Sequence, residues 1–360
     1  MKVDRGFNLY VDVTSACNAA CPFCIAPTIG RKNDTGFLEG LVWALDFTQN
    51  HYGSVQVTGG EPTLSTRLRD VIREVSRRMF HRVVLNTNGT GIKTPSLVID
   101  LEMMGFTHVN LSRHHYTESR NQEIMRFNRV ADASDEVFFD AVQLVLRSGM
   151  LARINCNLLA GYIDSAEEIE KFVAWCEGMD VHSVSFSETF PLGVFDQNLP
   201  IVPGYAEAHA VDLGPVVAAM DRKLTVTAPT NGSRMSAWSD GPPPRYSSWS
   251  GDAPSRSSWG SSGWSGIGST LPGHRRFWKT SSGALVSIKT LGGWNADGSP
   301  KPPAYSKADD PELKDGELYF AVVHPDGVVS ASWDKRERVL FSPTTEGKVE
   351  GRNSQLVFGR

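Results

Sequence analysis

Cys17-Asn18-Ala19-Ala20-Cys21-Pro22-Phe23-Cys24 places three thiols within eight residues of the chain. The stretch follows a short apolar run, residues 8–13, that is typical of a buried strand. Thiolates are soft ligands that suit iron–sulfur clusters and zinc. We therefore expect a metal site at the end of this strand, with Cys17, Cys21 and Cys24 as its ligands.

The supply of further ligands limits the kind of metal site. A structural zinc site and an ordinary electron-transfer cluster of four irons each take four protein ligands. The remaining cysteines are Cys156, in a strand-like run, and Cys176, on the apolar stripe of a helix, and we expect both to be buried in the core. Three thiolates on a four-iron cluster leave one iron open for a small molecule, which favours a catalytic site. The alternative is a zinc- or cluster-stabilised loop in a binding protein.

A second motif, Val55-Gln56-Val57-Thr58-Gly59-Gly60-Glu61-Pro62, ends another apolar run. Its glycines let the backbone approach a ligand closely. In type and order, the cysteine motif and this glycine motif resemble those of the radical S-adenosylmethionine (radical SAM) enzyme superfamily. The resemblance covers roughly residues 8–193.

Strand and helix patterns alternate over this same part of the chain, which predicts βαβ units around a parallel sheet. The apolar runs predict strands at 8–13, 54–58, 82–87, 107–112, 152–158 and 181–187. Amphipathic patterns predict helices at about 36–50, 66–79, 95–105, 137–145 and 165–176. The expected fold class is α/β, a partial (β/α)6 barrel of the TIM type with a C-terminal β-rich extension. Chemistry then belongs at the carboxyl ends of the strands, where the motifs lie.

The resemblance implies roles for residues at these strand ends. Cys17, Cys21 and Cys24 would hold a 4Fe–4S cluster that keeps one iron open for S-adenosylmethionine. Glu61 would contact the methionine amino group and Ser112 the ribose. The full set of expected cofactor contacts is Phe23, Gly59, Gly60, Glu61, Pro62, Ser112 and Asn157. The segment Asn86-Thr87-Asn88-Gly89 fits the family at a third strand end, and a plain turn is its alternative.

Arg113 and His114 are the candidate catalytic residues. Arg113 can meet a carboxylate or phosphate with two hydrogen bonds. His114, beside His115, suits substrate contact or proton transfer, and a supporting or surface histidine is the alternative.

The function that the resemblance implies is reductive cleavage of S-adenosylmethionine to a 5'-deoxyadenosyl radical, which takes a hydrogen atom from the substrate. Residues 184–193 are similar to the GTP 3',8-cyclase branch, but no cysteine follows Cys176, so that branch's auxiliary cluster is not expected. We expect a small anionic or nucleotide-like substrate and a one-electron donor such as flavodoxin or ferredoxin. A peptide-modifying radical SAM enzyme and a non-catalytic metal-stabilised binding protein are the alternatives.

The composition limits the possible partners and the cellular location of the protein. A formal net charge of −4 argues against a nucleic-acid footprint spread over the whole surface. No run of 18 or more apolar residues predicts a membrane span, and the first residues lack the apolar core of a signal peptide. Five cysteines, three of them in one motif, speak against a disulfide framework and for the cytoplasm.

The domain organisation is expected to be a barrel at 1–195, a linker at 196–272 and a β-rich region at 273–360 that covers the substrate. The linker contains a tract rich in Ser, Gly, Trp and Pro, which predicts a solvated segment. The alternative for its interleaved Arg and Trp residues is stacking on bases or binding of an anionic ligand. His324-Pro325-Asp326-Gly327 predicts the turn of a hairpin near the end of the chain.

Overall fold

The computed structural model describes residues 2–24, 36–51, 53–189, 204–227, 275–290, 295, 297–300, 317–331 and 339–343. The predicted Ser/Trp tract, the end of the sixth strand motif at 190–193 and the C-terminal residues 344–360 lie outside this described part.

The six predicted strands are present and alternate with helices. They are β1 (Lys2–Asp12), β2 (Ser54–Thr58), β3 (Val83–Thr87), β4 (His108–Ser112), β5 (Leu151–Asn157) and β6 (Ser183–Ser187). The helices that the sequence predicts are α1 (Phe37–Asn50), α2 (Leu68–Ser76), α3 (Pro95–Met103), α5 (Asp135–Arg147) and α6 (Ala166–Gly178). A further helix, α4 (Glu118–Met125), was not predicted because its residues are mostly polar.

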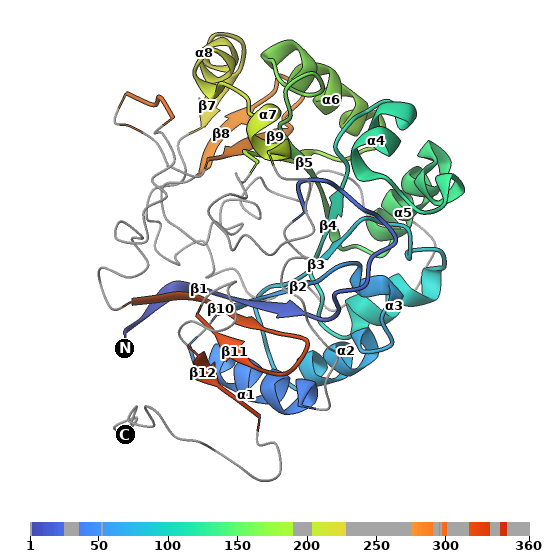
Figure 1. Ribbon diagram of the computed structural model, residues 1–360, viewed down its shortest axis with the longest axis vertical. Coiled ribbons are helices and arrows are strands. Elements are labelled where there is room, and N and C mark those ends of the chain that lie inside the picture. Colours follow the sequence, from blue (N-terminus) through green and yellow to red (C-terminus); the bar gives the residue numbers. More distant parts are fainter. Residues whose placement is uncertain are drawn as a thin grey trace.

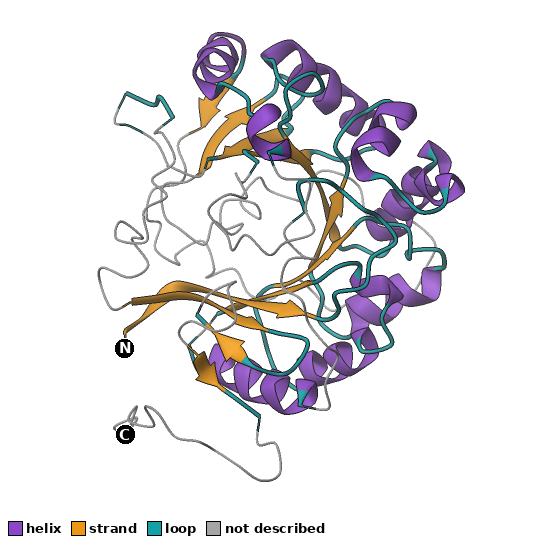
Figure 2. Ribbon diagram, in the orientation of Figure 1, coloured by secondary structure: helices purple, strands orange, loops and turns teal. Residues whose placement is uncertain are grey.

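Parallel pairing joins β1 through β6 in sequence order, and helices cover the outer side of the curved sheet (Figures 1 and 2). Each β–α–β crossover returns the chain to the same edge of the sheet, so all six strands point their carboxyl ends one way. In the described residues the sheet does not close by hydrogen bonds, and the fold is the expected partial α/β barrel.

The C-terminal strands extend both edges of this sheet. β9 (Leu285–Lys289) pairs parallel to β6, and β10 (Glu317–Val323) pairs parallel to β1. Antiparallel strands continue outward on each side, namely β8 (Arg275–Lys279), β7 (Thr225–Thr227), β11 (Val329–Ser330) and β12 (Val339–Phe341). The predicted hairpin at 324–327 is confirmed, since β10 and β11 pair antiparallel. The β-rich extension is thus part of the same sheet as the barrel strands.

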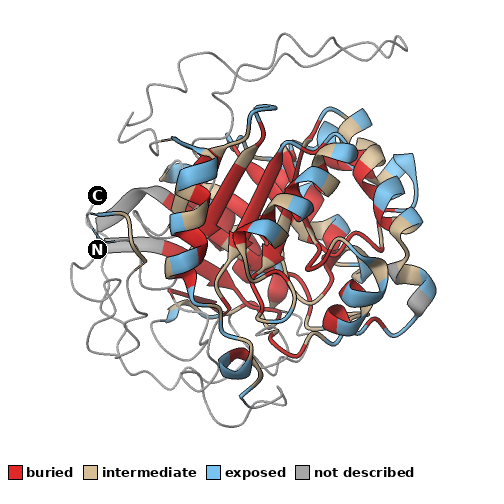
Figure 3. Ribbon diagram, turned by 90° about the horizontal axis from the view of Figure 1, so that it is seen from above, coloured by how far each residue is buried: buried red, intermediate tan, exposed pale blue. Residues whose placement is uncertain are grey.

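The two faces of the sheet differ in polarity because side chains alternate along each strand. On the outer face, Leu9, Val57, Leu85 and Ile154 are fully buried against the helices. Cys156 and Cys176 are in this same core, as predicted. The strands are mostly buried, whereas the helices expose part of their surface (Figure 3). The inner face is polar and hydrogen-bonded from strand to strand.

Examples of these inner contacts come from neighbouring strands. Asn110 Nδ2 donates to Asn86 Oδ1 at 2.8 Å, and Asn86 Nδ2 donates to the Val57 carbonyl at 3.2 Å. The amide groups of this inner face therefore satisfy part of one another's hydrogen-bonding capacity across the strands.

Helix ends follow the predicted capping pattern in part. Ser165 caps α6, with its side chain accepting from Glu168 N at 3.2 Å. Thr94 precedes Pro95 as expected, but its hydroxyl contacts Ser96 Oγ instead of a helix N–H. Two short helices, α7 (Tyr205–Ala208) and α8 (Leu213–Lys223), follow β6. Among the described residues no helix combines the length and apolarity that a bilayer crossing requires.

Candidate functional site

The cysteine loop begins where β1 ends and is folded back by hydrogen bonds within the loop, one of them to a sulfur. Ala19 N donates to Cys17 Sγ at 3.3 Å, and Cys24 N donates to the Cys21 carbonyl at 3.0 Å. The Cys21 thiol donates to the carbonyl of Met125 in α4 at 3.5 Å. All three thiols are half-buried on this loop.

The glycine motif after β2 packs directly beneath this loop. Gly60 N donates to the Thr14 carbonyl at 2.6 Å, and Glu61 N donates to the Ala16 carbonyl at 2.8 Å. A Cβ at Gly60 would lie 2.2 Å from the Ala16 oxygen, and Gly59 has φ +145°. From the sequence, we expect these glycines to let the backbone approach a ligand closely. In the structure, the space that their side chains would need is filled by the cysteine loop itself.

Glu61 is buried, with 1% of its surface exposed. Its Oε1 accepts from Thr63 N at 3.1 Å, from Thr63 Oγ1 at 2.6 Å and from Thr87 Oγ1 at 2.6 Å. Its Oε2 accepts from Asn88 N at 2.7 Å. Burial raises the pKa of Glu61, whereas these four hydrogen bonds favour the ionised carboxylate. The carboxylate therefore joins the end of β2 to the end of β3, and the contact with a methionine amino group stays a prediction.

Asn18 and Thr90, which are not among the predicted site residues, help to lock the third strand end to the cysteine loop. Asn18, between the first two cysteines, accepts from Asn88 Nδ2 at 2.8 Å and donates to Thr90 Oγ1 at 2.9 Å. The Asn86-to-Gly89 segment thus belongs to the site as a support. The polar residues of this segment were the available sequence signal for such a role, but a plain turn has the same kind of residues.

Arg113 lies at the end of β4 and points to the helices. Its guanidinium pairs with Asp135 at the start of α5 and donates to the His115 carbonyl at 2.9 Å. It also stacks over the rings of Phe138 and Trp175, 5.1 and 5.0 Å from their centroids. These contacts make Arg113 an anchor of β4 on α5 and α6. Ser112, the residue before it, is half-buried and lines a small cavity.

His114 is buried behind the cysteine loop. Its Nδ1 accepts from Asn157 N at 2.9 Å, and its ring meets Phe23 edge-on at 4.9 Å between centroids. Burial and the charge of Arg113 lower the pKa of His114 to about 3. The imidazole is therefore neutral near pH 7, with its remaining proton on Nε2. The structure thus brings together three of the predicted residues, Phe23, His114 and Asn157.

Burial and neighbouring charges raise the pKa values of two thiols of the loop. Burial raises the pKa of Cys17 to about 11, and the charges of Glu61 and Cys24 add to the effect. Burial also raises the pKa of Cys21, and the charges of Cys24 and Cys17 add to it. Such thiols are protonated until positive metal charge replaces the protons.

This donor set fits an iron–sulfur cluster. Within the described residues, no three His, Cys, Asp or Glu side chains surround one point as the ligands of a single ion would. The thiolates of a cluster bind separate irons, so they need to share a loop and not a point.

A protein-family model matches the part of the chain that contains this site. Residues 11–176 match the model of the Radical SAM superfamily. Over these residues the chain is therefore similar to the radical SAM enzymes, a family that implies a 4Fe–4S cluster and S-adenosylmethionine.

More particular relatives are similar over the same half of the chain. GTP 3',8-cyclase of Paracoccus denitrificans (strain Pd 1222) is 27% identical over 191 residues, which cover 51% of this chain and 53% of that protein. Probable GTP 3',8-cyclase of Saccharolobus islandicus (strain Y.N.15.51 / Yellowstone #2) is 26% identical over 190 residues, covering 52% and 58%. The chain thus spans a little over half the length of these relatives and resembles the GTP 3',8-cyclase branch.

Solved structures are similar to a lesser degree. Streptococcus suis SuiB bound to precursor peptide SuiA has a TM-score of 0.48 and 18% identity, covering 60% of this chain and 45% of that one.

Proposed function

We propose that this chain cleaves S-adenosylmethionine reductively at a 4Fe–4S cluster and abstracts hydrogen from a small anionic or nucleotide-like substrate. The observation that carries the proposal is the junction of the cysteine loop with the Gly59–Pro62 segment. The two motifs come from neighbouring strand ends and share backbone hydrogen bonds, so both border the same edge of the sheet. A loop that only stabilised the fold would not need the second motif.

The residues of the chain have separate tasks in this proposal. Cys17, Cys21 and Cys24 bind three irons and leave the fourth open to the methionine end of the cofactor. When bound, the reduced cluster and S-adenosylmethionine supply a carbon-centred radical at the 5' position of the deoxyadenosyl group. The ring of Phe23 packs edge-on against the ring of His114. This contact helps to exclude water from the thiolates of the loop.

The polar inner face of the sheet is the proposed substrate space. Gln56, Asn86 and Asn110 present amide groups there on three consecutive strands. Amides that bond to each other across strands are held in place before a ligand arrives, which lowers the entropy cost of binding. The relatives named GTP 3',8-cyclase motivate the nucleotide-like class. A one-electron donor such as flavodoxin or ferredoxin would reduce the cluster.

The test is anaerobic reconstitution with iron and sulfide, followed by dithionite and S-adenosylmethionine. We expect the visible charge-transfer absorption of an iron–sulfur cluster, and formation of 5'-deoxyadenosine measured by mass spectrometry. The variant with Cys17, Cys21 and Cys24 all changed to Ala should lose both signals and stay folded.

Cys156→Ala is the matched control, because that thiol is buried in the core away from the loop. It should keep the cluster and the product. Zinc co-purifying at one atom per chain, with no 5'-deoxyadenosine from the wild type, would instead support the metal-stabilised binding protein.

A further inference from the structure

Three arginine side chains converge on the inner side of the sheet, away from the cysteine loop. Arg82 directly precedes β3, Arg153 is the third residue of β5, and Arg275 is the first residue of β8. Only 5% of the surface of Arg82 and 4% of that of Arg153 are exposed. Buried arginines on an inward face are unusual, because the guanidinium does not lose its charge on burial.

Serine hydroxyls of β6 and β9 fix the positions of two of these guanidinium groups. Arg275 Nη1 donates to Ser185 Oγ at 2.6 Å and to Ser287 Oγ at 3.2 Å. Arg153 Nε donates to Ser183 Oγ at 3.4 Å. Ser183 and Ser185 are alternate residues of one strand, so their Cα atoms lie about 7 Å apart on the same face. The two arginines therefore occupy neighbouring positions above β6.

The third arginine lies on the same inner face, because Arg82 precedes Val84 by two residues and Val84 faces His108 of β4. The other side of β4 pairs with β5, where Arg153 faces Asn110. Burial lowers the pKa of Arg82 to about 10, and the positive charge of Arg275 adds to this. Burial also lowers the pKa of Arg153, and the charges of Arg275 and Arg82 add to it. Three like charges thus share one part of the barrel interior.

Arg275 and its neighbour Arg276 lie on opposite faces of β8 and have different partners. Arg276 points to the other face and forms an ion pair with Asp221 at 2.7 Å. The described hydrogen-bond partners of Arg275 are neutral hydroxyls, and its buried Nε has no hydrogen-bond partner among the described residues. A buried guanidinium with a vacant donor is costly unless an anion completes its contacts.

We propose that this arginine cluster binds an oxyanion, a phosphate or carboxylate group, inside the barrel. Its members are Arg82, Arg153 and Arg275 with Ser183, Ser185 and Ser287. Guanidinium groups bind both kinds of oxyanion through paired hydrogen bonds, and the serine hydroxyls hold two of these groups in place on the inner face. Taking this oxyanion to be part of the substrate rests on the function proposed above.

The position of the cluster sets the length of such a substrate. Arg153 lies four residues before Asn157, which ends β5 at the edge that carries the cysteine loop. Four residues of strand span about 13 Å. The substrate therefore carries its anionic group at one end and its reacting carbon at the other.

The experiment is isothermal titration of the reconstituted protein with inorganic phosphate and, separately, with succinate. We expect the wild type to bind at least one of them, and the preferred probe tells phosphate from carboxylate recognition. Arg275→Gln should raise the Kd at least tenfold, whereas Arg276→Gln on the opposite face should leave it within twofold.

Circular dichroism of each variant checks folding, and Ser185→Ala with Ser287→Ala provides a second test that keeps the charge. This double variant should also weaken binding several-fold. No binding of either probe to the wild type, or equal loss in Arg275→Gln and Arg276→Gln, would overturn the oxyanion site. Probe binding without 5'-deoxyadenosine formation would instead remove the proposed function and leave the site standing.

Discussion

At the scale of single residues, Glu61 shows how a motif residue can act through its neighbours. Its carboxylate accepts from Thr63, Thr87 and Asn88, so it holds the glycine segment against the end of β3. That segment in turn carries the cysteine loop through Gly60 N and Glu61 N. Glu61 is therefore a positioning residue in the structure, whatever it contacts when the cofactor is bound.

We predict that Glu61→Gln destabilises the protein by about 1–3 kcal/mol, because an amide group must face at least one buried donor. The melting temperature should fall, and 5'-deoxyadenosine formation should fall with it. Glu39→Gln, an exposed change of the same kind on α1, is the control and should alter neither. An unchanged melting temperature with lost product would show direct action on the cofactor instead.

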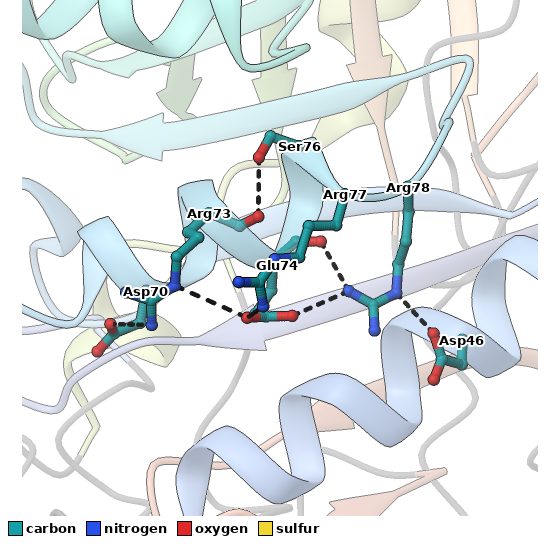
Figure 4. A network of polar contacts seen from close by, with 7 residues as sticks. All are labelled: Asp46, Asp70, Arg73, Glu74, Ser76, Arg77 and Arg78. Carbon is teal, nitrogen blue, oxygen red and sulfur yellow. Dashed lines mark hydrogen bonds and ion pairs between the residues drawn. The ribbon is translucent and has the colours of Figure 1, made fainter.

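At the scale of elements, an ion-pair network joins the neighbouring outer helices α1 and α2 (Figure 4). Glu74, 4% exposed, pairs with Arg77 at 2.5 Å and with Arg78 at 3.2 Å. Arg78 continues to Asp46 on α1 at 2.6 Å. The network lies far from the cysteine loop in sequence and links the two helices to each other.

We predict that Glu74→Ala lowers the free energy of unfolding by about 2 kcal/mol, because it leaves the poorly exposed Arg78 with fewer partners. Asp70→Ala is the matched control, since its pair with Arg73 has side chains 42% and 52% exposed. That exposed pair should contribute less than about 1 kcal/mol. Thermal unfolding of both variants measures the difference, and equal shifts would contradict a special role for Glu74.

At the scale of the whole molecule, strands distant in sequence complete the sheet on either side of the core barrel. The β10–β11 turn packs on α1 through two glycines, and a Cβ at Gly40 would lie 1.9 Å from the carbonyl oxygen of Gly327. Gly327 itself has φ +86°, a backbone conformation that favours glycine. The C-terminal hairpin therefore docks by close backbone approach.

We predict that Gly40→Ala displaces this hairpin and costs roughly 1–3 kcal/mol, as overpacking of a tight contact does. Limited proteolysis should then cut faster near residues 324–331. Gly178→Ala is the control, because a Cβ there would meet nothing within 4 Å. If both variants melted and were cleaved alike, the hairpin would not depend on the glycine contact.

Much of the fold was predictable because its signals are local. Alternating apolar and polar residues and amphipathic periods are properties of short windows, so β2 to β6 and five helices were predicted near their observed bounds. The strand β1 was predicted from residue 8 and begins at Lys2. The neighbourhood of the two motifs also followed, since parallel strands end at one edge. The helix α4 was missed because it lacks an apolar stripe.

The order of the two motifs along the chain and the burial of Cys156 and Cys176 were thus determined by the amino-acid sequence alone. Three-dimensional packing alone assigned β9 and β10 to opposite edges of one sheet, because strand pairing across some 100 to 300 residues leaves no local pattern. Packing also turned Arg113 toward α5 and gathered Arg82, Arg153 and Arg275 from separate strands. The direction in which a side chain points, and the charged groups that surround it, depend on which faces of the strands and helices pack together. That packing exists only in the folded chain.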